Sequence, residues 1–267
     1  MSSSSCPGDG RTLHLPASAR ARVPRPRHDQ EPPKPSGHND GARGRRALPD
    51  PAEMADLPGL RVAVRYQAAG GSPGAGGDWY LATPLPDGRV LIAIGDVAGH
   101  GPVVAPRMLH LSHALDTLAM TGEPAGRVLD WLSGIVQALG AEHTASALAG
   151  YFDPETRTFS WAQAGHPPPV LIRDGTVSAI TRPAGVLLGV PAAGYETAVT
   201  TLRPADIMLL YTDGLFERRD LLLEAGALRA FGAAVGQPDP EAAASAVIMA
   251  AGPNPGDDTC LLAIQVK

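Results

Sequence analysis

The sequence has few cysteines and no long apolar segment. Only two of its 267 residues are cysteine, Cys6 and Cys260, and they stand far apart. A disulfide framework or a thiolate metal site is therefore not expected. No segment approaches the roughly 18 apolar residues that span a membrane, and the N-terminal residues lack the apolar stretch of a signal peptide. We expect a soluble, cytoplasmic protein without a membrane partner.

Positive charge is scarce outside the N-terminal segment. Residues 1–50 hold nine Lys/Arg and five Asp/Glu, whereas the rest of the chain holds 13 and 22. A nucleic-acid-binding domain needs a basic face, so no nucleic-acid partner is expected. The glycine-rich loop at 71–77 lacks the Gly-Lys-Ser/Thr end of a P-loop, and the chain contains no G-x-S-x-G motif.

Composition divides the chain into two parts. Residues 1–55 are rich in Ser, Pro, Gly and Arg and have almost no apolar periodicity. Such a segment cannot bury enough apolar surface to offset its ordering entropy, so we predict a disordered tail. Residues 56–267 carry the apolar patterns and are predicted to form the folded domain.

Apolar periodicity within 56–267 predicts strands, two helices, a run of hairpins, two more helices and a final strand. The expected helices lie at 103–120, 124–140, 221–236 and 240–252, and the expected hairpin turns at 86–88, 153–155, 174–175 and 203–206. Hairpins imply antiparallel sheets, so the predicted class is α+β. Because the strands are strongly apolar, two stacked sheets with helices outside would bury them best.

Two aspartates flank the first hairpin at its open end. A two-residue turn at 87–88 pairs positions whose numbers sum to 175, and Asp78 and Asp96 sum to 174. The two residues are therefore expected to lie opposite each other or one place apart. Facing carboxylates repel, so either one takes a proton or a cation lies between them.

An all-oxygen cluster favours hard ions such as Mg²⁺ or Mn²⁺. The main-chain carbonyl of Val97 is a further candidate ligand, and Gly77 allows the backbone to approach an ion and its waters. The alternative interpretation is that these aspartates only cap turns, as Asp before Gly often does. That alternative suits Asp87, which lies between two strands, better than Asp78 and Asp96.

Further polar residues stand at strand ends. An apolar run ends on Asp213, and the last predicted strand begins after Asp257 and Asp258. His100 and His166 are candidates for a proton shuttle or a phosphate contact. Each is equally well interpreted as a hydrogen-bonded histidine in a turn.

Five motifs occur in order along the chain: GAGGDWY, IGDVAGHG, AQAGHPPPVLIRDG, LLYTDGLFE and GDDTCLLAI. Together they resemble the metal-dependent (PPM) serine/threonine phosphatases of protein phosphatase type 2C kind, and most closely the bacterial SpoIIE/RsbU branch. The resemblance covers about Leu60 to Lys267. It implies a central β-sandwich of two antiparallel sheets flanked by helices, in four layers (α-β-β-α), with two Mn²⁺ or Mg²⁺ ions at one edge.

The resemblance also implies roles for individual residues. Asp78 and Asp96 match acidic metal ligands of the family, with Val97 contributing its carbonyl. Asp213 and Asp257 match ligands of the second ion, and Asp258 stands beside them as a further or alternative ligand. By the same resemblance, a water activated by both ions would attack the phosphorus of a phosphoserine or phosphothreonine.

The implied substrate is a phosphorylated regulatory protein of the anti-sigma antagonist kind. Two other hypotheses stay open. Leu81 replaces an acidic residue that the family usually carries, which suits a catalytically weak or inactive module that only binds its regulator. The second of these hypotheses is a two-metal hydrolase that acts on nucleotides or other small phosphates. The phosphate-binding arginine of eukaryotic members has no clear match, and Arg65 is the nearest candidate.

Overall fold

The computed structural model describes residues 55–68, 76–99, 103–140, 143–180, 185–216, 224–254 and 256–267. All of them fall within the unit Arg46–Lys267. The predicted tail, residues 1–55, lies outside this described part apart from Ala55, with which the first strand begins. Its predicted disorder therefore stays a prediction.

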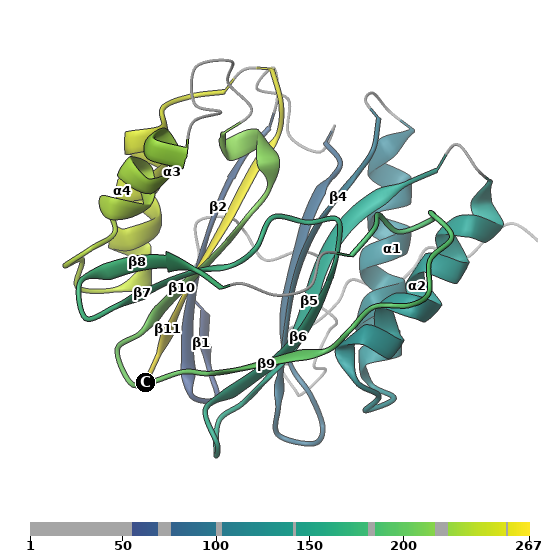
Figure 1. The fold of residues 1–267 in the computed structure, drawn as a ribbon, viewed down its shortest axis with the longest axis horizontal. Helices are drawn as coiled ribbons and strands as arrows, with labels where there is room; N and C mark the ends of the chain where they lie inside the picture. The colour runs from purple at the N-terminus through teal and green to yellow at the C-terminus, as the bar shows by residue number, and fades with distance from the viewer. Residues whose placement is uncertain are drawn as a thin grey trace, which may run out of the picture. The chain divides into compact units, whose positions relative to one another are not determined.

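Two antiparallel sheets form the centre of this unit (Figure 1). The first sheet has the strand order β1-β2-β11-β10-β7-β8, with β1 Ala55–Leu57, β2 Leu60–Gln67, β11 Thr259–Val266, β10 Ile207–Tyr211, β7 Val170–Arg173 and β8 Thr176–Ala179. The second has the order β3-β4-β5-β6-β9, with β3 Asp78–Pro84, β4 Val90–Val97, β5 Ala145–Asp153, β6 Thr158–Ala164 and β9 Ala198–Thr201.

Helices cover the outer face of each sheet (Figure 1). Helices α1 (Val104–Ala119) and α2 (Ala125–Leu139) pack on the second sheet, and α3 (Glu224–Gly232) and α4 (Pro240–Ala251) on the first. A short 3₁₀ helix, η2 (Asp213–Leu215), follows β10. The predicted α+β sandwich with helices outside is confirmed, including its four layers. Among the described residues, no helix is both long and apolar enough to cross a membrane.

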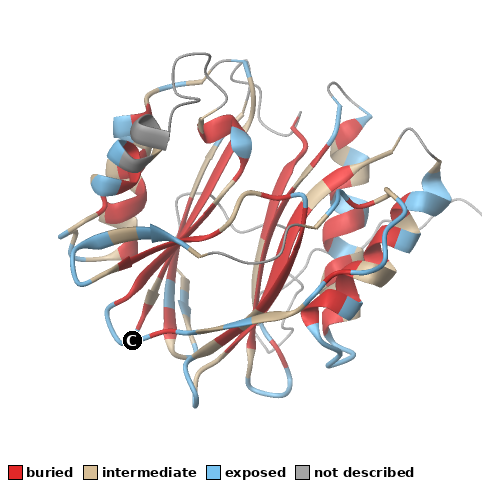
Figure 2. Ribbon diagram, in the orientation of Figure 1, coloured by how far each residue is buried: buried red, intermediate tan, exposed pale blue. Residues whose placement is uncertain are grey.

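Three apolar layers explain why the central strands read as continuous hydrophobic runs. One layer lies between the two sheets, and the other two lie between each sheet and its helices (Figure 2). Both faces of β4 and β11 are therefore covered, and nearly every residue of these strands is buried. A strand buried on both faces loses the polar alternation of a surface strand.

Local capping chemistry fixes the start of α4. The side chain of Asp239 accepts a hydrogen bond of 2.8 Å from the backbone N–H of Ala242, and Pro240 occupies the first helical position. A side-chain oxygen at this place satisfies a backbone donor that the first turn leaves unpaired, and proline there sacrifices no helical bond.

Three of the four predicted hairpins are confirmed, and the fourth is wrong. Strands β9 and β10, on either side of the turn at 203–206, do not pair with each other. Strand β9 pairs with β6 in one sheet, and β10 pairs with β7 and β11 in the other. The turn instead carries the chain between sheets. Its Asp206 is buried and bound to Arg173, which also donates to the carbonyl of Thr201 at 3.0 Å.

Candidate functional site

Polar side chains from both sheets meet at one end of the sandwich. In the second sheet, Asp78 lies directly opposite Asp96, and Asp96 opposite Ser146. Paired residues on neighbouring strands point to the same face. All three therefore lie in one row across β3, β4 and β5, on the face that carries Ile94 and Leu148 towards the other sheet. The predicted pairing of Asp78 with Asp96 is confirmed.

At the same end, the first sheet carries a second row of residues, on β2, on β11 and just after β10. Tyr66 on β2 pairs with Cys260 on β11, and the backbone N–H of Thr212 donates to the carbonyl of Cys260 at 3.0 Å. The hydroxyl of Thr212 also donates to Oδ2 of Asp78 at 2.8 Å, and accepts a 2.9 Å bond from the N–H of Cys260. A single buried hydroxyl thus ties the two sheets together at the acidic end.

Asp78 is the most buried of these acids. Its side chain is 3% exposed. Burial raises the pKa of Asp78 well above its ordinary value; the charge of Asp96 acts in the same direction, and the bond from Thr212 opposes them. Burial likewise raises the pKa of Tyr66, with a further contribution from Asp258. At this end of the sandwich, burial and neighbouring carboxylates therefore disfavour the charged form of Asp78 and of Tyr66.

The remaining acids come from the first sheet. Asp213 follows β10, and partial desolvation followed by the charge of Asp257 raises its pKa. Asp257 and Asp258 immediately precede β11. Oδ2 of Asp258 accepts a 3.2 Å bond from the backbone N–H of Gly77, which lies beside the other pair of acids. The carboxylates are thus arranged as two pairs, Asp78–Asp96 and Asp213–Asp257, with Asp258 between the sheets.

The glycines beside these acids leave space that a side chain would fill. A Cβ on Gly77 would lie 2.5 Å from the carbonyl oxygen of Val97 and 2.6 Å from Oδ1 of Asp96. A Cβ on Gly214 would collide with the backbone of Asp258. Carboxylate and carbonyl oxygens therefore face this space directly, and they are the atoms that hard divalent cations prefer.

The donor set fits ions that retain water. Among the residues described, no three His, Cys, Asp or Glu side chains form one group that could hold an ion. Mg²⁺ commonly binds through only one or two carboxylates and keeps several waters. The paired arrangement, with the carbonyl of Val97 beside Asp96, suits such an ion better than a cage made only of side chains.

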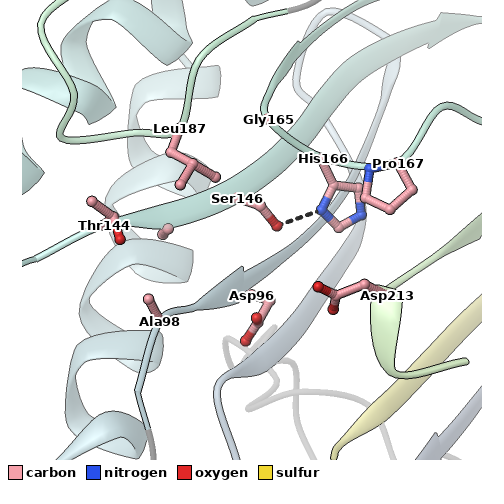
Figure 3. A pocket seen from close by; sticks show the side chains of 10 residues that line it. Asp96, Ala98, Thr144, Ser146, Gly165, His166, Pro167, Leu187 and Asp213 are labelled. Atoms are coloured by element: carbon pink, nitrogen blue, oxygen red, sulfur yellow. Dashed lines mark hydrogen bonds between the residues drawn. The ribbon is translucent and has the colours of Figure 1, made fainter. Parts of the chain in front are cut away.

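Of the two histidines singled out in the sequence, the structure describes one. His100 lies outside the described residues. His166, placed just after β6, is 3% exposed, and its Nδ1 lies 2.8 Å from the hydroxyl oxygen of Ser146 (Figure 3). Both residues line a pocket of about 490 Å³ together with Asp96 and Asp213.

Two residues singled out in the sequence face away from the acids. Leu81 packs against the layer beneath α1 and α2, on the opposite face of β3 from Asp78. An acidic side chain at this position would also point towards the helices. Arg65 forms an ion pair with Glu241 and donates to Ser245 at 2.8 Å, both on α4. Its guanidinium is engaged on the outer face of the sheet, so the suggestion that Arg65 binds phosphate is wrong.

Sequence reasoning missed three polar residues of this end. Thr212 stands immediately before Asp213, and Tyr66 belongs to the alternating pattern of β2. Ser146 stands near the start of β5. Their positions at strand ends were visible, but hydroxyl side chains are common there, and only the pairing between strands places them against the acids.

The hydroxyl of Thr212 provides a test of the link between sheets. Thr212→Val keeps the shape of the side chain but leaves Asp78 and the N–H of Cys260 each without a buried partner. We expect a loss of about 1–3 kcal/mol in the free energy of unfolding, measured by urea denaturation. Thr117→Val on the exposed face of α1 is the matched control and is expected to change stability by less than about 0.5 kcal/mol. Equal losses in the two variants would contradict the assigned role.

The fold defines a class of protein. Two stacked antiparallel sheets with helices on both outer faces form the fold of the type 2C protein phosphatases. The family model described as Stage II sporulation protein E (SpoIIE) matches residues 86–267, and the chain belongs to this family. The predicted SpoIIE/RsbU branch is confirmed.

Three similar proteins extend this result. Phosphoserine phosphatase RsbU of Bacillus subtilis (strain 168) is 30% identical over 132 residues, which are 48% of this chain and 39% of RsbU. The crystal structure of the RsbU and RsbW domains of Rv1364c from Mycobacterium tuberculosis has a TM-score of 0.71 and 30% identity, covering 79% of this chain and 62% of that one. This chain therefore spans less than two thirds of either protein.

The catalytic domain of the serine/threonine protein phosphatase PstP, solved in complex with two manganese ions, shares the fold. Its TM-score is 0.58 at 18% identity, over 78% of this chain and 98% of that domain.

Proposed function

We propose that this chain is a metal-dependent phosphatase that hydrolyses phosphoserine or phosphothreonine on a regulatory protein. The observation that carries the proposal is the direct pairing of Asp78 with Asp96 at the end of the sandwich where Asp213, Asp257 and Asp258 also gather. Membership of the SpoIIE family and the similarity to RsbU support it.

Each residue has a proposed task. Asp78, Asp96 and the carbonyl of Val97 would hold one divalent cation, and Asp213 with Asp257 the other; Asp258 is a further candidate ligand. Two bound Mn²⁺ or Mg²⁺ ions would lower the pKa of a bound water and balance charge on the phosphoryl oxygens. The protein's own contribution is to fix the carboxylates before the substrate arrives, since Thr212 holds Asp78 and Gly77 holds Asp258.

The proposed substrate is a small phosphorylated regulator of the anti-sigma antagonist kind. Support comes from the similarity to RsbU, a phosphoserine phosphatase, and to the structure that joins RsbU and RsbW domains. The net negative charge of the chain outside residues 1–50 also favours a protein substrate over a nucleic acid. A cytoplasmic location remains our prediction from the sequence.

Release of phosphate tests the proposal. Adding Mn²⁺ or Mg²⁺ to chelator-treated protein is expected to raise phosphate release from a phosphoserine-bearing regulator by at least about a hundredfold. Rates on the phosphoprotein should exceed those on nucleotides at equal concentration. A faster reaction with nucleotides would favour the hydrolase of small phosphates.

A second substrate separates an enzyme from a binding module. Metal-stimulated turnover of p-nitrophenyl phosphate would exclude an inactive regulator-binding domain, because this substrate needs no protein recognition. Absence of metal-dependent release from both substrates would refute the proposed activity. Leu81, the sequence feature that suits an inactive module, packs on the side of β3 that faces the helices, away from Asp78.

A further inference from the structure

The pocket beside the acids contains few groups that can donate a proton. Besides Asp96 and Asp213, its polar lining consists of the hydroxyls of Thr144 and Ser146 and the imidazole of His166 (Figure 3). The remaining described lining residues are Ala98, Ala145, Gly165, Pro167 and Leu187, so no Lys or Arg stands among the described residues that line this pocket. Apart from the proposed metal ligands, the described groups that can supply a proton to a group bound here are the two hydroxyls and the imidazole.

The proposed reaction creates a demand for a proton. Hydrolysis of phosphoserine breaks the bond between phosphorus and the seryl oxygen, and the electron pair stays on that oxygen. A serine alcohol is a far weaker acid than a nitrophenol, so its departing oxygen needs a proton as the bond breaks. A nitrophenolate leaves without this help.

Ser146 is placed to meet this demand. It follows Asp78 and Asp96 in the row across the second sheet, so its hydroxyl lies on the same inner face as the acids. Its oxygen lies 2.8 Å from Nδ1 of His166. Figure 3 shows the Ser146 side chain directed to the space that Asp96 and Asp213 also face.

The surrounding backbone fixes His166. Gly165, immediately before it, has φ +61°, donates to the carbonyl of Gly185 at 2.8 Å and forms a parallel bridge with Ala147. A side chain at Gly165 would collide with Leu187, and positive φ disfavours other residues there. The backbone that immediately precedes the imidazole is thus fixed beside β5, the strand that carries Ser146.

We propose that Ser146, oriented and supplied with a proton by His166, protonates the seryl or threonyl oxygen that leaves phosphorus. This assignment rests on the phosphatase activity proposed above. The bond from phosphorus to the attacking water oxygen forms, and the bond to the seryl oxygen breaks. The leaving oxygen takes the proton of Ser146, and Ser146 takes one from Nδ1 of His166, which starts as the doubly protonated imidazolium and becomes neutral imidazole. The proton lost by the attacking water restores the imidazolium, so the products are serine and inorganic phosphate.

The experiment compares leaving groups in the full chain with Mn²⁺. The substrates are a phosphoserine peptide, phenyl phosphate and p-nitrophenyl phosphate. Ser146→Ala and His166→Gln are each expected to lower kcat for the phosphoserine peptide about a hundredfold. Both should lower kcat for p-nitrophenyl phosphate less than about threefold, with phenyl phosphate between. Retained turnover of p-nitrophenyl phosphate also reports that the buried His166 variant has folded.

Matched variants sharpen the comparison. Ser146→Thr retains a hydroxyl and is expected to recover most of the rate on the peptide. His110→Gln, at an exposed position on α1, controls for loss of a histidine and should leave every rate unchanged.

Equal losses on all three substrates would overturn the proposal, because they would indicate disturbed structure or metal binding. Unchanged rates in both variants would overturn it as well. A dependence on leaving group that appears in His100→Gln and not in the Ser146 or His166 variants would assign the proton to His100. If the unaltered chain releases no phosphate from any substrate, the proposed function itself fails, which is a distinct result.

Discussion

Replacing Asp78 with asparagine is expected to abolish phosphate release and, at the same time, to stabilise the metal-free protein. The activity should fall on the order of a thousandfold or more, the scale of losing one preorganised electrostatic group. The stability should rise because asparagine removes a buried charge that faces Asp96 and still accepts the hydrogen bond from Thr212. We expect a gain of about 1 kcal/mol or more, or roughly 2–4 °C in Tm for each kcal/mol in a domain of this size.

The raised pKa of Asp78 also determines how the stability of the metal-free protein changes with pH. The pKa of Asp78 in the folded protein is raised above its ordinary value of 3.8. Between these two values the folded state binds more protons than the unfolded state, so stability falls as pH rises. The metal-free protein should therefore lose stability as pH rises from about 4 through the raised pKa of Asp78. Thermal unfolding at a series of pH values should show a shallower slope in Asp78→Asn.

Bound cations should make the unaltered protein more stable than Asp78→Asn, the reverse of the order expected without metal. A ligand that binds only the folded state at a hundred times its Kd contributes about 2.7 kcal/mol. Mn²⁺ is expected to raise the Tm of the unaltered protein by several degrees and to have little effect on Asp78→Asn. Asp87→Asn in the exposed turn of the same hairpin is the control and should retain activity. Equal metal stabilisation of all three proteins would place the cations elsewhere.

Gly77→Ala is expected to lower activity about a hundredfold or more, since a shift near 1 Å in a reacting group has effects of this size. A methyl group at Gly77 would press on the carbonyl of Val97 and the carboxylate of Asp96, and would meet Val104 at 3.2 Å. The carbonyl belongs to the backbone and cannot rotate away, so the carboxylate must move. Steady-state kinetics with p-nitrophenyl phosphate would measure the loss.

The control for this substitution is Gly134→Ala. Gly134 lies on the exposed face of α2, and a Cβ there would meet nothing within 4 Å. Alanine in a helix is favoured over glycine by about 0.5–1 kcal/mol, so this variant should be slightly more stable and fully active. If Gly77→Ala retained full activity, the space at Gly77 would not be needed by the acids.

Local features were predictable from the sequence, and long-range pairings less so. The register that sets Asp78 against Asp96 follows from one short hairpin, so counting residues placed the two to within one position; the observed pairs sum to 174, not the 175 of a two-residue turn. The approach of Asp257 to Asp213 depends on β10 lying beside β11, and spacing alone gives no register for strands so far apart. Only the resemblance to a family predicted that these two residues act together.

The error at β9 has the same origin. The residues before and after 203–206 alternate as a hairpin would, and the turn carries the expected residue types. Which sheet a four-residue strand joins is decided by its partner, here β6, which stands well before it in the chain. Thr212 was missed for a related reason, because its hydroxyl bonds to Asp78 in the other sheet, a contact that the sequence does not reveal.

Strand β11 comes after every other described element in the chain, yet it is inserted between β2 and β10. Asp257 and Asp258, which immediately precede it, complete the acidic end. Without β11 the first sheet would be divided into β1-β2 and β10-β7-β8, so this end of the sandwich depends on a non-local pairing of the kind that forms late in folding. The acidic end is therefore complete only when a late element of the described chain is inserted into the middle of the first sheet.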